Sequence, residues 1–252
     1  MGQDMANFPP LKKYLLYCID QMIDPYGLEG QFLDVGCGAG DISQHLAKKS
    51  WKGEAIDESQ EAVERARTTM TTYHGVLVEN RSLFDQAGVF RTILAMDVIE
   101  HIEDDMSALR KISSLLPKGG HFVLSVPSNP HEWRWDDDCF GHFRRYTETE
   151  LREKLGAAGF SVLEIWDFTF PVFWLMRRVY TRIKSSPANL ETNKRERTHK
   201  SSGRNPWEIP LVSDWLSRDN ALWRAVYKWQ FSRFRFWLNR GHEVIVLARK
   251  NG

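Results

Sequence analysis

The chain has 252 residues, of which 42% are hydrophobic and 27% charged, and its formal net charge is +1. The length suits one domain with a sizeable core, and the composition excludes a disordered or fibrous protein. Three cysteines without CxxC spacing exclude a disulfide framework and argue against structural zinc, so we expect a reducing, cytoplasmic compartment. We expect neither a cleaved leader nor a spanning helix, because residues 1–13 lack an apolar stretch and no run of about 18 apolar residues occurs.

Strand-like and helix-like segments alternate through the first 168 residues. The apolar spacing predicts, in chain order, helix 11–23, strand 31–35, a helix capped by Asp41, strand 53–57, helix 59–70, strands 75–79 and 92–99, helix 104–116, strand 121–127, helix 147–159 and strand 160–168. With a last strand at 242–250, this order predicts an α/β protein with a doubly wound, mostly parallel sheet of seven strands.

The second part of the chain differs in charge and in rhythm. Residues 166–252 hold 17 Lys/Arg against 7 Asp/Glu and seven of the ten tryptophans, whereas residues 1–165 hold 17 Lys/Arg against 26 Asp/Glu. An amphipathic stretch at 168–184 precedes a polar segment at 185–206, which predicts a loop. A long helix is predicted at 213–239, with an apolar stripe formed by Leu216, Trp223, Tyr227, Phe231, Phe234 and Leu238.

A glycine-rich turn follows the first strand, in FLDVGCGAGD (32–41). Gly36, Gly38 and Gly40 allow positive φ and a close approach of the backbone to a ligand at a helix N-terminus. A dinucleotide pyrophosphate favours a third glycine at position 41, where this chain has Asp41. Asp34 also suits a cationic group better than a phosphate, so the loop favours a ligand without phosphate, with an ordinary tight turn as the alternative.

The DVGCGAG motif resembles the first motif of the class I S-adenosylmethionine-dependent methyltransferases, and the resemblance covers about residues 28–168 and 242–250. It implies a Rossmann-like sheet and S-adenosylmethionine as the cofactor. It also implies that Asp34 lies near the methionine amino group and that Gly36, Cys37 and Gly38 line the methionine and ribose.

Further cofactor contacts are expected at the ends of the next strands. Asp57 lies 19 residues after Gly38, where a carboxylate can accept both ribose hydroxyls; NAD enzymes use the same device, and the alternative role is a helix N-cap. The resemblance places Ser82 and Leu83 beside adenine and Asp97 beside the cofactor at the end of the fourth strand. Glu100-His101 after Asp97 can be interpreted as a metal or acid–base pair or as shaping the loop, and we favour the second, so no metal site is expected.

A second motif, GHFRRYT (141–147), resembles a GHxRRY signature found in a subset of bacterial methyltransferases. His142 could take a proton from the acceptor, with Tyr146 as a second catalytic candidate. Arg144 and Arg145 could bind a carboxylate or phosphate, or they could pair with Asp136, Asp137 and Asp138. The remaining substrate-binding candidates are His131 and Trp174.

The insert at 168–240 separates two parts of the core, 1–167 and 241–252. Four interpretations stay open: a substrate lid walled by Phe170, Phe173 and Trp174; a peripheral membrane contact through Arg177, Arg178, Arg182 and Lys184; a homodimer interface; or a packed helical cap. Nucleic acid is disfavoured as a partner, because the first part is acidic and no RNA-binding motif is present.

The expected function is transfer of a methyl group from S-adenosylmethionine to a small-molecule or lipid-linked acceptor, and the arginines favour an anionic one. The alternatives are an NAD-dependent oxidoreductase or epimerase, which Asp41 disfavours, and a non-catalytic cofactor-binding interaction protein. The sequence does not distinguish methylation of oxygen, nitrogen or carbon.

Overall fold

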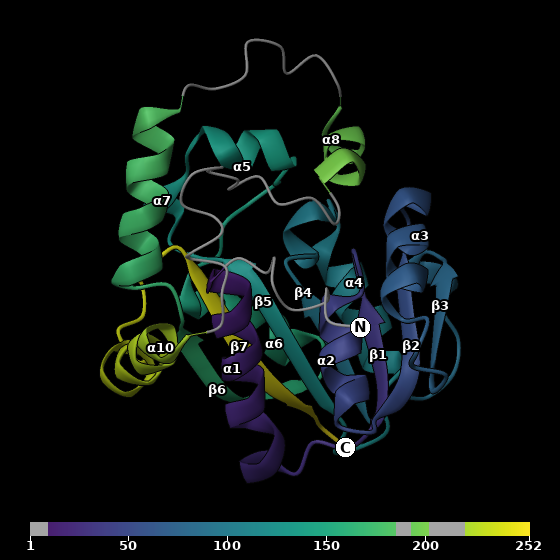
Figure 1. Cartoon of the computed structure of the whole chain (residues 1–252). Helices are drawn as coiled ribbons and strands as arrows, with labels where there is room; N and C mark the ends of the chain where they lie inside the picture. The colour runs from purple at the N-terminus through teal and green to yellow at the C-terminus, as the bar shows by residue number, and fades with distance from the viewer. Residues whose placement is uncertain (1–9, 185–192, 202–219) are drawn as a thin grey trace.

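A computed structural model describes residues 10–184, 193–201 and 220–252 (Figure 1). Its centre is one seven-stranded sheet with the order β3-β2-β1-β4-β5-β7-β6. The strands are β1 (Gln31–Val35), β2 (Lys52–Asp57), β3 (Val76–Asn80), β4 (Thr92–Met96), β5 (His121–Pro127), β6 (Phe160–Asp167) and β7 (Glu243–Lys250). β7 pairs antiparallel with β5 and with β6, and the other four strand pairings of this sheet are parallel, so the predicted seven-stranded, mostly parallel sheet is confirmed.

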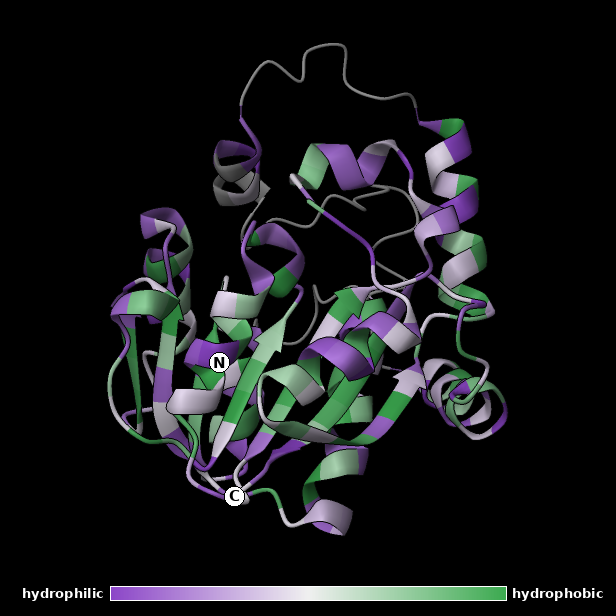
Figure 2. Cartoon of the chain, turned by 180° about the vertical axis from the view of Figure 1, so that it is seen from behind, coloured by the Kyte–Doolittle hydropathy of each residue, from purple (hydrophilic) through white to green (hydrophobic). Residues whose placement is uncertain are grey.

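Helices cover both faces of the sheet. One face carries α4 (Asp105–Ser114) and α6 (Glu148–Ala157), and the other carries α1 (Pro10–Tyr26), α2 (Asp41–Lys48), α3 (Gln60–Thr69), α7 (Val172–Ile183) and α10 (Ala221–Phe234). Neighbouring residues of one strand serve opposite faces: Phe32 packs in the cluster with α1, whereas Leu33 packs in the cluster with α4 and α6. This two-sided burial explains why the central strands β4, β5 and β7 contain continuous apolar runs (Figure 2).

The carboxyl ends of the parallel strands meet at one edge of the sheet, and polar elements lie beyond it. These are the 3₁₀ turns η1 (Leu83–Asp85), η2 (Ile99–His101) and η3 (Pro130–Glu132) and the helices α5 (Trp135–Phe140) and α8 (Lys194–Ser201). Figure 1 shows α5 and α8 above this edge, with α7 beside them. Ligands of open α/β sheets bind at this edge, so it is the place to look for the site.

The boundaries of three predicted elements are wrong. β4 ends at Met96 instead of 99, because Asp97 has a positive φ of 54° and its N–H donates to Ser125 O. The N-cap of α2 is Gly40 with φ 84°, so Asp41 is the first helical residue. α10 ends at Phe234 instead of 239, because the carbonyl of Arg235 already accepts a hydrogen bond from the N–H of Asp167 in β6.

The insert is partly outside the described residues. The start of the predicted helix, including Leu216, falls there, as do 185–192 and 202–206 of the predicted loop. Residues 194–201 form α8, so the loop prediction is wrong for that stretch; Asn193 accepts a hydrogen bond from Glu196 N and starts the helix. Trp223 and Tyr227 of the predicted stripe are buried against α1 and α7, as expected for the apolar face of a helix. The division into core and insert stays a prediction.

Among the residues that the structure describes, no helix combines the length and the hydropathy that crossing a bilayer requires. Arg177, one of the cations considered for lipid contact, is buried, because it pairs with Asp136 and Asp137. Phe173 is buried too and stacks on Trp223, so it packs in the core and does not line an open pocket.

Candidate active site

The glycine turn is shaped so that side chains do not fit. Gly36 has φ 67°, and a Cβ there would lie 2.5 Å from Val98 Cγ2. A Cβ on Gly40 would lie 3.2 Å from Ala66 of α3. Gly38 also has a positive φ, of 55°. The loop therefore exposes backbone at the start of α2, as the sequence predicts for a site that holds a ligand closely.

Asp57 fixes this turn from the end of β2. Its Oδ2 accepts a hydrogen bond from Gly38 N at 2.9 Å, and its Oδ1 accepts one from Ser59 N at 2.8 Å. The side chain that caps α3 is Ser59, which accepts from Ala62 N, so Asp57 is not the N-cap. Asp57 is thus a rigid carboxylate that lies directly against the glycine loop.

Asp34 lies inside the same turn and is 1% exposed. Ser43 donates a hydrogen bond to its Oδ2 at 2.6 Å, yet burial dominates and raises the pKa of Asp34 to about 7. Cys37 is buried between the glycines, and burial raises the pKa of its thiol. Lys12 of α1 pairs with Asp41, and burial lowers its pKa to about 8 while Asp34 and Asp97 oppose that shift. Sequence reasoning missed Lys12, because nothing in its local pattern distinguishes it from a surface lysine.

The structure places Ser82 and Leu83 just after β3. Ser82 caps η1 and donates a hydrogen bond to Glu58 at 2.7 Å, while Leu83 is buried in the cluster with α4. Asp97, at the end of β4, is exposed to solvent and accepts a hydrogen bond from Ser125 Oγ at 2.8 Å. All three lie at the carboxyl edge of the sheet, and their contacts with the cofactor stay predictions.

The second motif is held by a buried ion network centred on Asp137 of α5. Its carboxylate pairs with Arg145 at 2.7 Å and with Arg177 at 2.8 Å, and it contacts His142 Nδ1 at 2.8 Å. Burial alone would raise the pKa of Asp137, but the hydrogen bond from His142 and the charge of Arg145 outweigh it and hold the pKa well below its usual range. Asp137 therefore orients the His142 ring through its Nδ1, and Nε2 is the ring nitrogen that Asp137 does not contact.

Both arginines of the motif have partners inside the chain. Arg145 pairs with Asp137, one of the three aspartates considered as its partners, and it also donates to the carbonyls of Ser128 and His242. Arg144 instead pairs with Asp105 at 2.8 Å, which is not one of the three aspartates considered. Tyr146 is 1% exposed and donates to Asp105 as well, at 3.0 Å. These contacts favour a structural role for the three side chains.

The other two acceptor-site candidates differ in their surroundings. His131 in η3 is exposed. Trp174 of α7 donates from Nε1 to Glu132 at 3.1 Å, and the guanidinium of Arg178 lies 4.1 Å from the centre of its ring. Trp174 thus joins α7 to the loop after β5, next to the Asp137 network.

Glu100 and His101 lie directly below the His142 loop. Glu100 is fully buried, and burial raises its pKa well above its usual range, helped by the charge of Asp97. Burial and the neighbouring His142 lower the pKa of His101 to about 3, so His101 is neutral at physiological pH. The centres of the two imidazole rings are 4.8 Å apart. The pair Glu100-His101 is recognisable in the sequence, but its position next to His142 depends on the tertiary fold.

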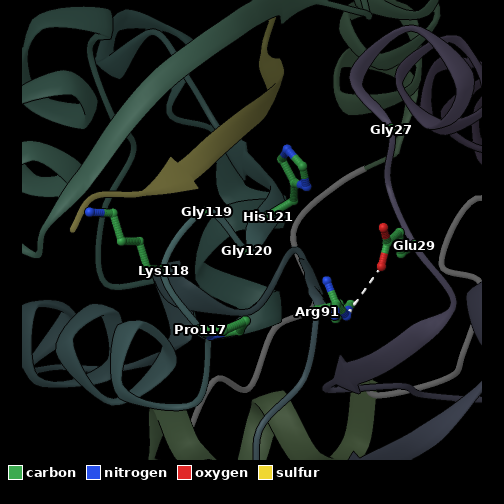
Figure 3. A pocket seen from close by; sticks show the side chains of 8 residues that line it. All are labelled: Gly27, Glu29, Arg91, Pro117, Lys118, Gly119, Gly120 and His121. Carbon is green, nitrogen blue, oxygen red and sulfur yellow. Dashed lines mark ion pairs between the residues drawn. The ribbon is translucent and has the colours of Figure 1, made fainter.

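A shallow pocket lies at the opposite edge of the sheet and is not part of this site (Figure 3). It is lined by Gly27, Glu29 and Arg91 together with residues 117–121, and Arg91 pairs with Glu29 at 3.1 Å. These residues precede or begin strands β1, β4 and β5, so they lie at the amino ends of the strands, away from the glycine turn.

The comparisons with known proteins agree with this geometry. A family model described as a methyltransferase domain matches residues 13–165. The chain belongs to this methyltransferase domain family. The sequence-based prediction of an S-adenosylmethionine-dependent methyltransferase with a Rossmann-like sheet is thereby confirmed, and the NAD-dependent alternative is not favoured.

Individual relatives of this methyltransferase match only part of the chain or have low sequence identity. A ubiquinone biosynthesis O-methyltransferase from Vibrio parahaemolyticus is 32% identical over 107 residues, which cover 40% of this chain and 45% of that protein. The chain thus matches less than half the length of that relative. The structure of a magnesium protoporphyrin IX methyltransferase from Synechocystis has a TM-score of 0.55 at 14% identity, covering 96% of this chain and 85% of the other. The cyclase SpnF has a TM-score of 0.58 at 19% identity, covering 94% and 81%. Such structural likeness shows the fold alone.

Proposed function

We propose that this methyltransferase transfers a methyl group from S-adenosylmethionine to a hydroxyl oxygen of a small molecule. The observation that carries the proposal is the glycine turn braced by Asp57 at the carboxyl edge of the sheet. In it, Asp34 faces the cofactor's ammonium group and Asp57 the ribose hydroxyls. The choice of oxygen is supported by the relatives from Vibrio and Xanthomonas, which are ubiquinone biosynthesis O-methyltransferases.

The acceptor hydroxyl loses its proton beside the His142 side chain. Methyl transfer is an in-line displacement on a carbon that the sulfonium already activates, so the protein mainly aligns the acceptor and removes one proton. Asp137 holds the His142 ring at Nδ1. Asp97 follows β4, the strand that lies between β1, which precedes the glycine turn, and β5, which precedes the His142 loop. Arg144 and Arg145 are paired inside the chain, which favours an acceptor bound by its hydroxyl over one bound by an anionic group.

A screen for turnover tests this proposal. The protein is incubated with S-adenosylmethionine and a panel of small phenols, alcohols, amines and carboxylic acids, including lipid-linked phenols, and production of S-adenosylhomocysteine is measured. Turnover with hydroxylated acceptors supports the proposal. Turnover with amines alone would overturn the assignment to oxygen.

A further inference from the structure

Next to the His142 loop lies a buried carboxylate, that of Glu100, to which no described residue donates a hydrogen bond. Glu100 is 0% exposed, and neither of its side-chain oxygens has a hydrogen-bond partner among the described residues. Buried carboxylates are normally hydrogen-bonded, paired or bound to a metal, because an uncompensated one is costly. The surroundings of Glu100 therefore need a proton or a cation to complete them.

Two imidazoles lie next to this carboxylate. His101 Nε2 is 4.0 Å from Glu100 Oε1, and the rings of His101 and His142 meet edge to face at 72°. One ligand atom from each of Glu100, His101 and His142 lies within 4.8 Å of the other two. An ion bound at about 2.0–2.2 Å from nitrogen and oxygen ligands holds neighbouring ligand atoms about 3–4 Å apart, so small side-chain rotations close the site.

The outer nitrogen of each imidazole is already held by another residue. His142 Nδ1 lies 2.8 Å from Asp137 Oδ1, and His101 Nδ1 lies 3.0 Å from Thr198 Oγ1 of α8. Nε2 of each ring is therefore the nitrogen left for the centre of the group. Histidines that bind metals show this arrangement, in which a hydrogen bond at one nitrogen fixes the tautomer and orientation for ligation by the other.

Gly141, the glycine of the GHxRRY motif, allows helix α8 to pack over Glu100, His101 and His142. Gly141 has φ 80°, and a Cβ there would lie 2.4 Å from the carbonyl oxygen of Lys194 in α8. This close approach brings Thr198 to His101 and places Lys194 Nζ 2.9 Å from the carbonyl oxygen of His142. Gly141 and His142 of the motif thus belong to one local structure, in which α8 packs over Glu100 and His101. Neither proton removal nor cofactor binding explains this packing.

We propose that Glu100, His101 and His142 bind a divalent transition-metal cation, of the class of Zn²⁺ or Mn²⁺. Two imidazoles and one carboxylate form a donor set that suits such ions better than Mg²⁺ or Ca²⁺, which prefer oxygen ligands alone. Three protein ligands leave coordination positions open for water or a substrate oxygen. The expectation that these residues only shape the loop is replaced by this proposal.

The consequence for catalysis rests on the proposed function. An acceptor hydroxyl that occupies an open position on the ion releases its proton to solvent water more readily. The hydroxyl oxygen then donates a lone pair to the methyl carbon, and a C–O bond forms as the C–S bond breaks. The electron pair of that bond stays on sulfur, so the sulfonium becomes a neutral thioether. In this scheme, His142 acts as a ligand and not as the proton acceptor.

Metal binding by the full chain tests the proposal. The protein is stripped of metal with a chelator and then dialysed against Zn²⁺ or Mn²⁺. Bound zinc is measured by elemental analysis. Free Mn²⁺ is measured by electron paramagnetic resonance. We expect one ion per chain and, for Glu100→Gln and His101→Ala, a dissociation constant raised at least about tenfold. Thr198→Val, which touches no ligand atom, should weaken binding by a smaller factor. His74→Ala, which removes an exposed histidine outside the group, is the matched control and should bind as the wild type does.

Two results would overturn the metal site: a wild-type protein that binds neither ion at millimolar concentration, or Glu100→Gln and His101→Ala variants that bind both ions as tightly as the wild type. Circular dichroism of each variant shows whether it is folded. Titration of the same samples with S-adenosylhomocysteine separates this inference from the proposed function. A protein that binds S-adenosylhomocysteine but neither metal ion would contradict only the metal site. A protein that binds a metal ion but not S-adenosylhomocysteine would contradict only the proposed methyl transfer.

Discussion

The amide of Gly38 donates a hydrogen bond to Asp57 Oδ2 across 2.9 Å, which ties the glycine turn after β1 to the end of β2. The two residues are 19 positions apart, and the parallel pairing of β1 with β2 brings them together. One carboxylate therefore holds the turn while it stands next to the space that the turn leaves open. The turn that we propose as the cofactor site is in this sense held in place by the chain itself.

Replacement of Asp57 should weaken cofactor binding while the chain stays folded. Asp57→Ala should weaken the binding free energy of S-adenosylhomocysteine by about 1.5–3 kcal/mol, which is the scale of a charge-assisted hydrogen bond. Asp57→Asn keeps an uncharged acceptor oxygen and should lose less. Calorimetry gives both affinities, and thermal melting confirms folding. An unchanged affinity in a folded Ala variant would remove Asp57 from the ribose site.

Cofactor binding should depend on pH through Asp34. Burial raises the pKa of Asp34 to about 7, and an ammonium group binds the charged carboxylate, so binding must release a proton below that pH. The affinity for S-adenosylhomocysteine should rise about tenfold between pH 6 and 7.5. Lys12 and Asp57 also face Asp34; Lys12, with a pKa of about 8, stays largely protonated over this range.

Calorimetry in buffers of different ionisation enthalpy measures the released proton directly. Asp34→Asn is the control, because it removes the titrating group and should bind with little pH dependence. The role of Asp34 would be contradicted by an equal pH dependence in the wild type and in this variant.

His142 should matter for turnover and not for cofactor affinity. With an acceptor from the screen, His142→Ala should lower kcat roughly 10²–10⁴-fold, the range for loss of a group that assists proton removal. The dissociation constant of S-adenosylhomocysteine should hardly change, because the glycine turn does not involve His142. A variant with normal kcat would return His142 to a structural role.

The network around Asp137 should carry much of the stability of the acceptor loop. Asp137→Ala leaves Arg145 and Arg177 with fewer partners in the interior and should cost about 3–5 kcal/mol of unfolding free energy. Asp138→Ala on the same helix is the matched control and should cost less, because the pairs of Asp137 remain. Urea denaturation measures both.

The pH dependence of that stability follows from the same carboxylate. The pKa of Asp137 is lower in the folded protein than in the unfolded chain, where it is about 3.9. Its contribution is therefore fully present at neutral pH and is lost as the pH falls from about 5 through the folded pKa. The loss of stability on acidification should be smaller in Asp137→Ala than in the wild type. Equal acid sensitivity would place the critical carboxylates elsewhere.

Local sequence patterns were sufficient for the sheet, the glycine turn and the strand ends that carry Asp34 and Asp57. They depend on apolar runs and glycines, whose physical meaning is local. The ends of β4 and α10 were not predictable in this way, since a hydrogen bond from Asp97 to Ser125 and one from Asp167 to Arg235 decide them. The partners of Arg144, the burial of Arg177 and the meeting of Glu100 with His142 likewise arise from segments about 40 residues apart, which only the tertiary fold brings together.

We expect the glycine turn to bind S-adenosylmethionine. Calorimetric titration of the wild-type chain with S-adenosylhomocysteine and, separately, with NAD tests this expectation. Saturable binding of one S-adenosylhomocysteine per chain and no measurable binding of NAD are expected, because Asp34 and Asp41 stand where a pyrophosphate would need a neutral or basic surface. Binding of NAD without binding of S-adenosylhomocysteine would contradict it.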